Sequence, residues 1–491
     1  MSFTFIDLFS GIGGFKMALS QNGGHCLGFS EIAKDAIDVY CENFKVNPTD
    51  NLGDITKIKS LPHHDLLTAG VPCQSWSIAG KNLGFDDDRG QLWNDTIYLL
   101  QQSQPKAFIF ENVKGLVDPR NVEALGYILT RIKAAGYYAN YFVINSSDYG
   151  VLQSRVRVYI IGFKENKYFL KFNLPPVSKQ KIKLGDLLGI PSQLINNSSI
   201  VQKDLFGNVV ESKTMSLSST NGLNDYFLFN DIRNGHTTIH SWDIIETTKR
   251  QKNICLLLLK NRRKSHYGVL DGNPLSLKHF QCLDSSIKQI EIDQLVELEI
   301  LKPEEYRFTL NNHSNSDLTE EEATVLASIE SQELIVDELK KNKLLKTQKL
   351  SITKIIESLK SKGIIHCNEI RYDFKNGKIS TGLFGVNRIF LPTSHIFPTL
   401  VASDSNDFVA LKLIQATNQI EFKHKFIEEI YQPRCFRKIS QSEACLIQGF
   451  PKNFKLPQSR AKWMKLLGNS VSVPVVDQLC KAIVNTGIFN D

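Results

Sequence analysis

Hydrophobic and polar positions change their period in a regular order along the first third of the chain. Short apolar runs bounded by glycine, proline or polar residues predict strands at 3–9, 25–31, 65–70, 107–113 and 156–163. Between them, apolar residues spaced for one face of a helix predict helices at 15–24, 33–44, 91–103 and 121–135. Alternating strands and helices form a mostly parallel sheet covered on both faces. We therefore predict an α/β fold, with ligands at the carboxyl ends of the strands.

Length, charge and cysteine usage narrow the class of protein. The chain has 491 residues, which predicts two to three domains. The net charge of +7 permits a polyanionic partner without requiring one. The nine cysteines are scattered without a Cys-x-x-Cys pair, which argues against zinc and disulfides and fits a reducing cytoplasm. We expect no metal, and the apolar runs are too short to cross a membrane.

Chemically suggestive residues gather at the predicted strand ends. The loop "SGIGG" at 10–14 follows the first strand, and Glu31 ends the second. The glycine spacing of this loop differs from the dinucleotide-binding pattern. The loop is therefore either a nucleoside site without a pyrophosphate or a plain tight turn. In "GVPCQSWS", Cys73 is a buried core thiol, a metal ligand or a nucleophile. Glu111 is a solvated strand end or a buried acid.

Six ordered motifs decide between these readings. They are "DLFSGIGGF" (7–15), "GVPCQSWS" (70–77), "FENVKGL" (110–116), "QSRVRVYIIGF" (153–163), "RKISQSEACLIQGFP" (437–451) and "LLGNSVSVPVV" (467–476). As a set they resemble the C5-cytosine DNA methyltransferases of bacterial restriction–modification systems. The resemblance covers roughly 3–165 and 434–485. It implies a Rossmann-like, S-adenosylmethionine-dependent methyltransferase domain with a mixed, mostly parallel sheet.

The resemblance assigns catalysis to Cys73, Glu111, Arg155 and Arg157. Carbon 5 of cytosine attacks a methyl group only after a nucleophile adds at C6, and a thiolate from Cys73 can add and later leave. Glu111 would donate to N3 of the flipped base if burial raises its pKa. The two arginines alternate by two and share one side of the chain. They would hold the base carbonyl, a phosphate or Glu111 itself.

The resemblance also assigns two sets of binding residues. The cofactor would contact Phe9, Gly11, Ile12, Gly13, Gly14, Glu31, Asp54, Ile55, Pro72, Leu92, Asn469 and Ser470. DNA would contact Gln74, Ser77, Lys81, Thr399, Lys340, Lys341 and Lys343. Two positions depart from the pattern of many relatives: Ile32 stands where an aromatic residue would stack on adenine, and Leu152 where a proline precedes the arginine motif.

The middle of the chain is predicted to be a separate region. We expect a catalytic domain formed by 1–165 and 434–491, interrupted by an inserted α+β target-recognition region at 166–433. Helical runs at 319–329, 332–342 and 351–363, then a hairpin at 364–380 around an Asn-Gly turn, suggest a winged helix within 318–382. A less clear copy lies near 245–310. The alternative is a plain helical scaffold with solvated lysines.

The resulting hypothesis is a monomeric enzyme that methylates carbon 5 of cytosine in double-stranded DNA. It would act in the bacterial cytoplasm or nucleoid, beside a restriction endonuclease that acts separately. An RNA methyltransferase of the tRNA-modifying branch and a non-catalytic winged-helix regulator are the alternatives. An amino-group methyltransferase would need a Pro-Pro-aromatic segment, and "LPPV" at 174–177 does not provide it. The target sequence is not readable from the residues.

Overall fold

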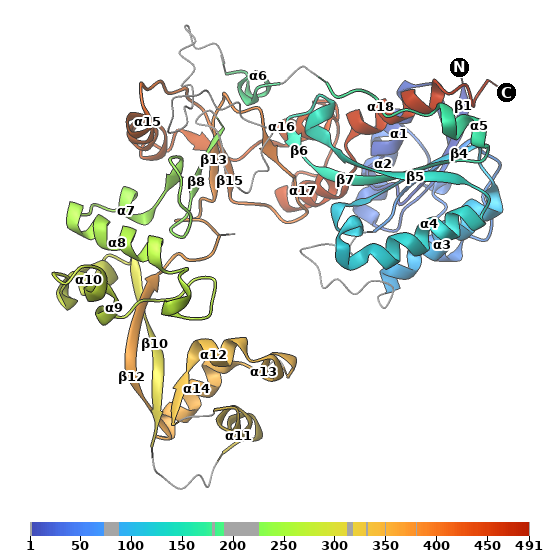
Figure 1. Cartoon of the computed structure of the whole chain (residues 1–491). Coiled ribbons are helices and arrows are strands. Elements are labelled where there is room, and N and C mark those ends of the chain that lie inside the picture. Colours follow the sequence, from blue (N-terminus) through green and yellow to red (C-terminus); the bar gives the residue numbers. More distant parts are fainter. Residues whose placement is uncertain are drawn as a thin grey trace. The chain divides into compact units, whose positions relative to one another are not determined.

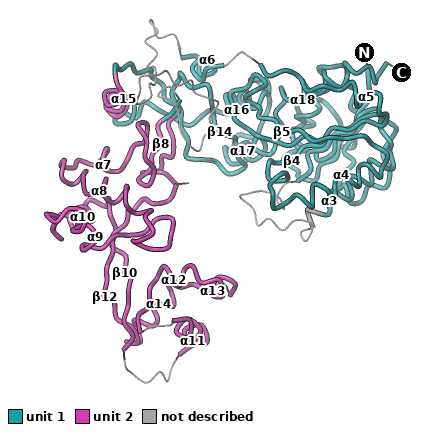
Figure 2. Tube along the Cα trace, in the orientation of Figure 1, with its two compact units in different colours: residues 1–226, 390–417, 428–491 teal, residues 227–389, 418–427 magenta. Residues whose placement is uncertain are grey.

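The computed structural model describes residues 2–72, 88–178, 182–190, 225–311, 318–329, 332–348, 350–379 and 381–490. The chain divides into two compact units (Figure 2). The first comprises 1–226, 390–417 and 428–491, and the second comprises 227–389 and 418–427. The second unit thus includes fewer residues than the insertion expected at 166–433. Both ends of the chain contribute to the first unit.

The first unit is built on a six-stranded sheet with the order β2-β1-β3-β4-β7-β5 (Figure 1). Four neighbouring strands are parallel: β2 (Gly24–Ser30), β1 (Phe3–Leu8), β3 (Leu66–Gly70) and β4 (Ala107–Val113). The antiparallel pair at the other side is β7 (Val156–Phe163) and β5 (Tyr138–Asn145). The predicted α/β fold with a mixed, mostly parallel sheet is confirmed.

Helices cover both faces of this sheet, as Figure 1 shows. Ile6 and Leu8 of β1 point to one face, in a cluster with Trp93 of α3 (Asp88–Ser103) and Ile128 of α4 (Val122–Ala134). On the other face Phe3 stacks on Phe489, with ring centroids 4.4 Å apart. There lie α1 (Gly14–Gln21), α2 (Lys34–Phe44) and α18 (Val473–Val484). The strand alternation places each set of side chains on its own face.

The C-terminal segment folds back onto the start of the chain. Its first helix, α16 (Gln441–Gln448), begins at Ser440 with a capping box and ends at Gly449, whose φ is 92°. A side chain there would place its Cβ 2.1 Å from Pro474 Cδ, so this close approach requires glycine. Helix α17 (Arg460–Asn469) follows. The chain then returns beside the first strand, where Phe489 stacks on Phe3.

Short elements complete the first unit. They are α5 (Asn166–Lys171), α6 (Leu184–Leu188), the parallel pair β6 (Gln153–Ser154) and β14 (Phe397–Pro398), and the antiparallel pair β15 (Asp407–Ala410) and β16 (Phe436–Arg437). The β6–β14 pair joins a residue pair of the arginine motif to a stretch about 240 positions later, at the positions Gln153↔Phe397. This pairing brings the two stretches side by side.

The described residues of the second unit form two hydrophobic clusters. One packs α8 (Lys249–Asn261), α9 (Leu277–Leu283) and α10 (Gln289–Glu297). The other packs α11 (Glu320–Ala327), β11 (Glu333–Ile335), α12 (Val336–Lys341), α13 (Lys343–Thr347) and α14 (Ile352–Ser361). Two ten-residue strands, β10 (Leu301–Leu310) and β12 (Ile365–Phe374), contribute to both. Smaller elements are α7 (Ser241–Ile244), α15 (Gln419–Phe426) and the strands β8 (Tyr226–Phe229), β9 (Thr238–Ile239) and β13 (Arg388–Phe390).

The hairpin predicted at 364–380 is wrong. β12 pairs antiparallel with β10, from Leu301↔Phe374 to Leu310↔Ile365, so its partner comes from before the three helices. The Asn376–Gly377 pair lies beyond the end of β12 and does not connect two strands of this sheet. The run at 332–342 also divides into β11 and α12. The helices at 319–329 and 351–363 are present, but the winged-helix assignment is not confirmed.

No helix within the described residues is long and apolar enough to cross a membrane.

Candidate active site

Glu31 at the end of β2 holds the glycine loop between β1 and α1. Its Oε2 accepts a hydrogen bond from the backbone N–H of Gly11 at 2.9 Å. Its Oε1 accepts from the N–H groups of Ile32 and Ala33, each at 2.8 Å. A carboxylate offers about four acceptor positions, so one further donor can be accommodated. Glu31 therefore shapes the loop and still presents an acceptor where a ribose hydroxyl is expected.

The glycine loop is closed on one side and open on the other. A Cβ on Gly13, whose φ is +85°, would lie 2.2 Å from Phe44 Cε2 in α2. A Cβ on Gly11, whose φ is +54°, would meet nothing within 4 Å. Phe9 also has a positive φ of 51°, which is uncommon for a residue with a side chain. The loop thus leaves its backbone accessible at Gly11, as binding of an adenosyl ligand requires.

Ser470, from the far end of the chain, lies directly against this loop. A Cβ on Gly14 would lie 2.9 Å from Ser470 Oγ and 2.7 Å from Val471 Cγ2. Ser470 is buried, whereas Asn469, the last residue of α17, is exposed. The structure therefore brings together Ser470 and the glycine loop, which the sequence assigned to one cofactor site from opposite ends of the chain.

Asn51 fixes the other rim of this region. Its Oδ1 accepts from the backbone N–H groups of Glu31 and Gly53, both at 3.1 Å, and its Nδ2 donates to the Glu31 carbonyl at 2.9 Å. Three residues after Asn51, the Asp54 carboxylate accepts from the backbone N–H and hydroxyl of Thr56, and these bonds lower the pKa of Asp54. A charged acceptor at Asp54 thus directly follows the loop that Asn51 joins to Glu31, where adenine is expected.

Three predicted cofactor residues border a single hydrophobic cluster. Phe9 and Leu92 are partly buried against it, and Ile55 is part of it. Ile12 is only 1% exposed, so its side chain serves the core and its contribution to a ligand would come from its backbone. These side chains give the region an apolar floor beneath the polar groups of Glu31 and Asp54.

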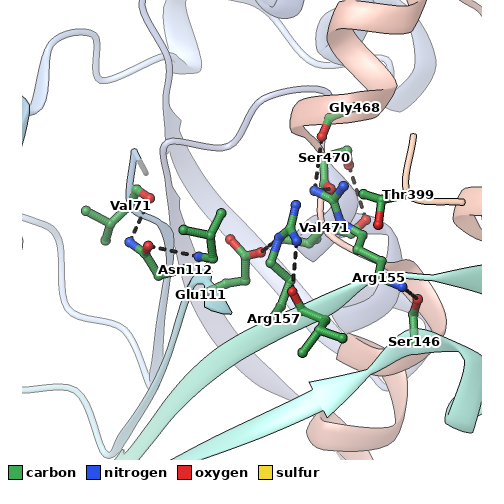
Figure 3. A network of polar contacts seen from close by, with 12 residues as sticks. Val71, Glu111, Asn112, Ser146, Arg155, Arg157, Thr399, Gly468, Ser470 and Val471 are labelled. Carbon is green, nitrogen blue, oxygen red and sulfur yellow. Dashed lines mark hydrogen bonds and ion pairs between the residues drawn. The ribbon is translucent and has the colours of Figure 1, made fainter. Parts of the chain in front are cut away.

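Glu111 and Arg157 form a buried ion pair at the carboxyl end of β4. Arg157 Nε lies 3.0 Å from Glu111 Oε1 (Figure 3). Burial raises the pKa of Glu111, while the positive charges of Arg157 and Arg155 oppose that shift. A carboxyl group whose pKa is raised keeps its proton to a higher pH, which suits it to donate that proton. The antiparallel register Val113↔Arg157 of β4 and β7 places the two side chains together.

Asn112 positions the segment that leads to Cys73. Its Nδ2 donates to the Val71 carbonyl at 3.2 Å, and its Oδ1 accepts from the N–H of Val113 at 2.8 Å (Figure 3). In the β3–β4 pairing, Gly70 stands opposite Glu111. The chain thus passes Glu111 and reaches Pro72 at the same sheet edge. Cys73, Gln74, Ser77 and Lys81 lie outside the described residues.

Arg155 has a different role from Arg157. Its Nη2 donates to the carbonyls of Gly468 and Ser470, at 3.0 and 2.8 Å, and its Nη1 donates to the carbonyl of Leu400 at 3.3 Å (Figure 3). The side chain is only 3% exposed. Of the roles predicted for the arginine pair, binding of Glu111 belongs to Arg157. Arg155 holds backbone from the C-terminal segment.

The predicted DNA contacts fall on two separate units. Thr399, in the first unit, donates its hydroxyl to the Ser154 carbonyl at 2.6 Å. Lys340 and Lys341 end α12, and Lys343 begins α13, in the second unit, where all three are exposed. Among the described residues, no group of three or more His, Cys, Asp and Glu side chains is arranged to hold a metal ion.

Comparisons with known proteins identify the family of this chain. The family model for C-5 cytosine-specific DNA methylases matches residues 3–485. The chain belongs to this family.

Several curated relatives match this chain over nearly their whole length. Type II methyltransferase M.HgiBI of Herpetosiphon aurantiacus is 39% identical over 491 residues, covering 99% of this chain and 98% of the relative. Type II methyltransferase M.BanI of Aneurinibacillus aneurinilyticus is 29% identical, covering 99% of this chain and 97% of the relative. M.NlaIV of Neisseria lactamica is 30% identical, covering 98% and 99%. The protein is a DNA cytosine-5 methyltransferase.

Sequence reasoning missed three residues whose side chains hold backbone at the site of the methylase. Asn51 lies in a loop without a motif. Gln153 and Gln448 lie within two of the quoted motifs, so motif membership marked them, but nothing in the sequence showed that their side chains meet. Gln153 Nε2 donates to Gln448 Oε1 at 2.5 Å, and Gln448 is fully buried.

A further buried acid lies beneath the glycine loop of the methylase. Asp7 of β1 is 0% exposed, and its Oδ1 accepts from the Thr68 hydroxyl at 2.9 Å. Burial raises the pKa of Asp7 to about 7, although the Thr68 hydrogen bond and the charge of Lys16 oppose the shift. The pKa of Asp7 in the folded state lies above its value in the unfolded chain. The free energy of unfolding therefore falls as the pH rises from about 4 towards 7.

This shift predicts the pH dependence of an Asp7→Asn variant. Between pH 5 and pH 8 the wild type should lose about 2–3 kcal/mol of unfolding free energy that the variant does not lose. Urea unfolding at both pH values measures the difference. Asp38→Asn, at an exposed position of α2, should follow the wild type. If the free energies of unfolding of Asp7→Asn and the wild type differ by the same amount at both pH values, Asp7 does not titrate in this range.

Proposed function

We propose that this methylase transfers a methyl group from S-adenosylmethionine to carbon 5 of a cytosine flipped out of DNA, with Cys73 as the nucleophile. The observation that carries the proposal is the buried Glu111–Arg157 pair beside the segment that leads to Cys73. A carboxyl with a raised pKa has a use there, because attack on the ring requires a donor at N3.

The chain's own groups would act in a defined order. The Cys73 thiolate would add to C6 while Glu111 donates a hydrogen bond or proton at N3, so that the electron pair gathers on C5. Arg157 would keep Glu111 oriented through their ion pair. After methyl transfer, a base would remove the C5 proton and the thiolate would be expelled from C6, which restores the aromatic ring.

The residues at the glycine loop fit S-adenosylmethionine, which would supply the methyl group. The backbone is open at Gly11, Glu31 retains one acceptor position, and an ionised Asp54 directly follows Gly53, whose N–H Asn51 binds. Ser470 would close the region from the C-terminal side. Phe9 and Leu92 would provide the apolar contacts.

We further propose that the methylase is the modification enzyme of a type II restriction–modification system, as its relatives' names suggest. A separate endonuclease would share its target, and the enzyme would act as a monomer in the bacterial cytoplasm. The region at 166–433, which includes the second unit, would select the target sequence. Its exposed lysines on α12 and α13 would contact phosphates.

Cys73→Ser should abolish methyl transfer while DNA binding persists, because a hydroxyl is far less ionised than a thiol near neutral pH. Transfer of tritiated methyl groups to DNA measures turnover, and a gel-shift assay measures binding. Cys282→Ser, at an exposed cysteine of α9, is the matched control and should retain turnover. Substantial turnover in Cys73→Ser would exclude Cys73 as the nucleophile.

Glu31→Ala should weaken binding of S-adenosylhomocysteine by about 10- to 100-fold, the usual effect of losing hydrogen bonds to a charged group. Calorimetry measures the affinity. Glu42→Ala, which removes an exposed carboxylate from α2, should bind as the wild type does. Equal affinity in both variants would remove Glu31 from the cofactor site. Binding of NAD in place of the adenosyl ligand would overturn the cofactor assignment.

Replacing Lys340, Lys341 and Lys343 together by Gln should weaken DNA binding across sequences and reduce its salt dependence, since phosphate contacts do not specify bases. Binding titrations at several salt concentrations measure both effects. The matched control replaces Lys133, Lys167 and Lys171 of α4 and α5, with the same change in net charge. Equal weakening in both variants would show a general charge effect.

A further inference from the structure

The backbone of Leu400 is held on both sides by the arginine motif. Its N–H donates to Gln153 Oε1 at 3.2 Å, and its carbonyl accepts from Arg155 Nη1 at 3.3 Å. The preceding residue, Thr399, bonds to the Ser154 carbonyl. Leu400 lies in 390–417, the stretch by which the chain returns from the second unit. The arginine motif thus binds the return segment, residues 390–417, mainly through the backbone of that segment.

The same amide side chain leads onward to the cofactor wall. Gln153 Nε2 donates to Gln448 Oε1 at 2.5 Å, and Gln448 Nε2 donates to the carbonyls of Ser470 and Val471, at 2.8 and 3.0 Å. Gln153 and Gln448 are 1% and 0% exposed. One buried chain of hydrogen bonds therefore runs from the Leu400 N–H to Ser470, which lies against the glycine loop.

Close backbone packing supports this chain of bonds. A Cβ on Gly468 would lie 2.6 Å from the nitrogen of Ala402 and from the carbonyl carbon of Val401. The return segment therefore passes directly over the end of α17, two residues before Ser470. Arg155 joins the same two segments, since it donates to both Leu400 and Ser470. Neither segment can shift without breaking bonds to the other.

We propose that Gln153 and Gln448 are positioning residues that couple cofactor binding to binding of target DNA. The inference rests on the proposed function, in which Ser470 contacts the cofactor and Thr399 contacts DNA. Ordering of Ser470 by the cofactor fixes the Gln448 amide, which fixes Gln153 and with it the backbone at Leu400. In a dry interior an unpaired amide or carbonyl is costly, so the partners move together.

The coupling predicts that replacing the glutamine on the DNA side weakens cofactor binding. Replacing the glutamine on the cofactor side should weaken DNA binding. Gln153→Met, which removes the contact with Leu400 but none with Ser470, should weaken binding of S-adenosylhomocysteine about tenfold. Gln448→Met, which removes the contacts with Ser470 but none with Leu400, should weaken binding of the target duplex by a similar factor. The duplex carries the site that bisulfite sequencing of DNA from expressing cells identifies. Calorimetry and fluorescence anisotropy measure the two affinities.

A matched control separates this effect from general loss of stability. Asn43 is also a side-chain amide that joins the two ends of the chain, with bonds to the backbone of Lys455 at 2.8 Å in both directions. It contacts neither the glycine loop nor the return segment. Asn43→Leu should lower the melting temperature and leave both affinities unchanged. If each methionine variant affects only the ligand on its own side, the coupling is disproved.

Hydrogen exchange tests the coupling in the wild type, without any variant. S-adenosylhomocysteine should slow exchange in peptides that cover 397–402 as well as in those that cover 468–471. Protection of 468–471 alone would overturn the coupling but leave the cofactor site intact. A wild type that neither binds S-adenosylhomocysteine nor methylates DNA would instead overturn the proposed function.

Discussion

The buried ion pair between Glu111 and Arg157 is the interaction on which the rest of the site depends. A carboxyl group withdrawn from water tends to hold its proton, and an adjacent guanidinium favours the charged form. Glu111 experiences both influences: burial raises its pKa, and the guanidinium of Arg157 opposes that shift. Keeping this pair in place requires the antiparallel register of β4 and β7 and the parallel pairing of β3 with β4.

The site is assembled from stretches that are far apart in the sequence. The glycine loop and Glu31 come from the first strands, and Ser470 comes from the last helices. Gly14 allows the close contact between them, because any side chain there would collide with Ser470. Arg155 ties the same C-terminal backbone to the strand that carries Arg157. The insertion can therefore be large, since these contacts close the first unit on either side of it.

Much of the fold followed from local pattern. The strands predicted at 107–113 and 156–163 have the observed bounds, because continuous apolar runs mark strands buried on both faces. The edge strand β5 was not predicted, since Tyr138, Tyr141 and Val143 are exposed and no clear alternation remains. The 364–380 hairpin is wrong because an Asn-Gly pair favours a turn between neighbouring strands but does not require one. The true partner of β12 lies about 60 residues earlier, beyond the reach of any local signal.

The candidate site was predicted as a set of residues, and the structure adds how some of them divide their roles. Arg155 and Arg157 look equivalent in the motif, but one holds three backbone carbonyls and the other holds Glu111. Gln153 and Gln448 are separated by 295 positions, so only a folded chain shows that they meet. Motifs identify residues that are needed, whereas contacts between motifs identify what each one does.

Covalent capture tests the central claim most directly. A duplex with 5-fluorocytosine at the target position, incubated with the methylase and S-adenosylmethionine, should form an adduct that survives denaturation. Fluorine cannot leave as a cation, so the thiolate is not expelled. Mass spectrometry of the digested adduct should place the modified base on Cys73. An adduct on another residue, or none with a duplex whose unfluorinated form is methylated, would contradict the account.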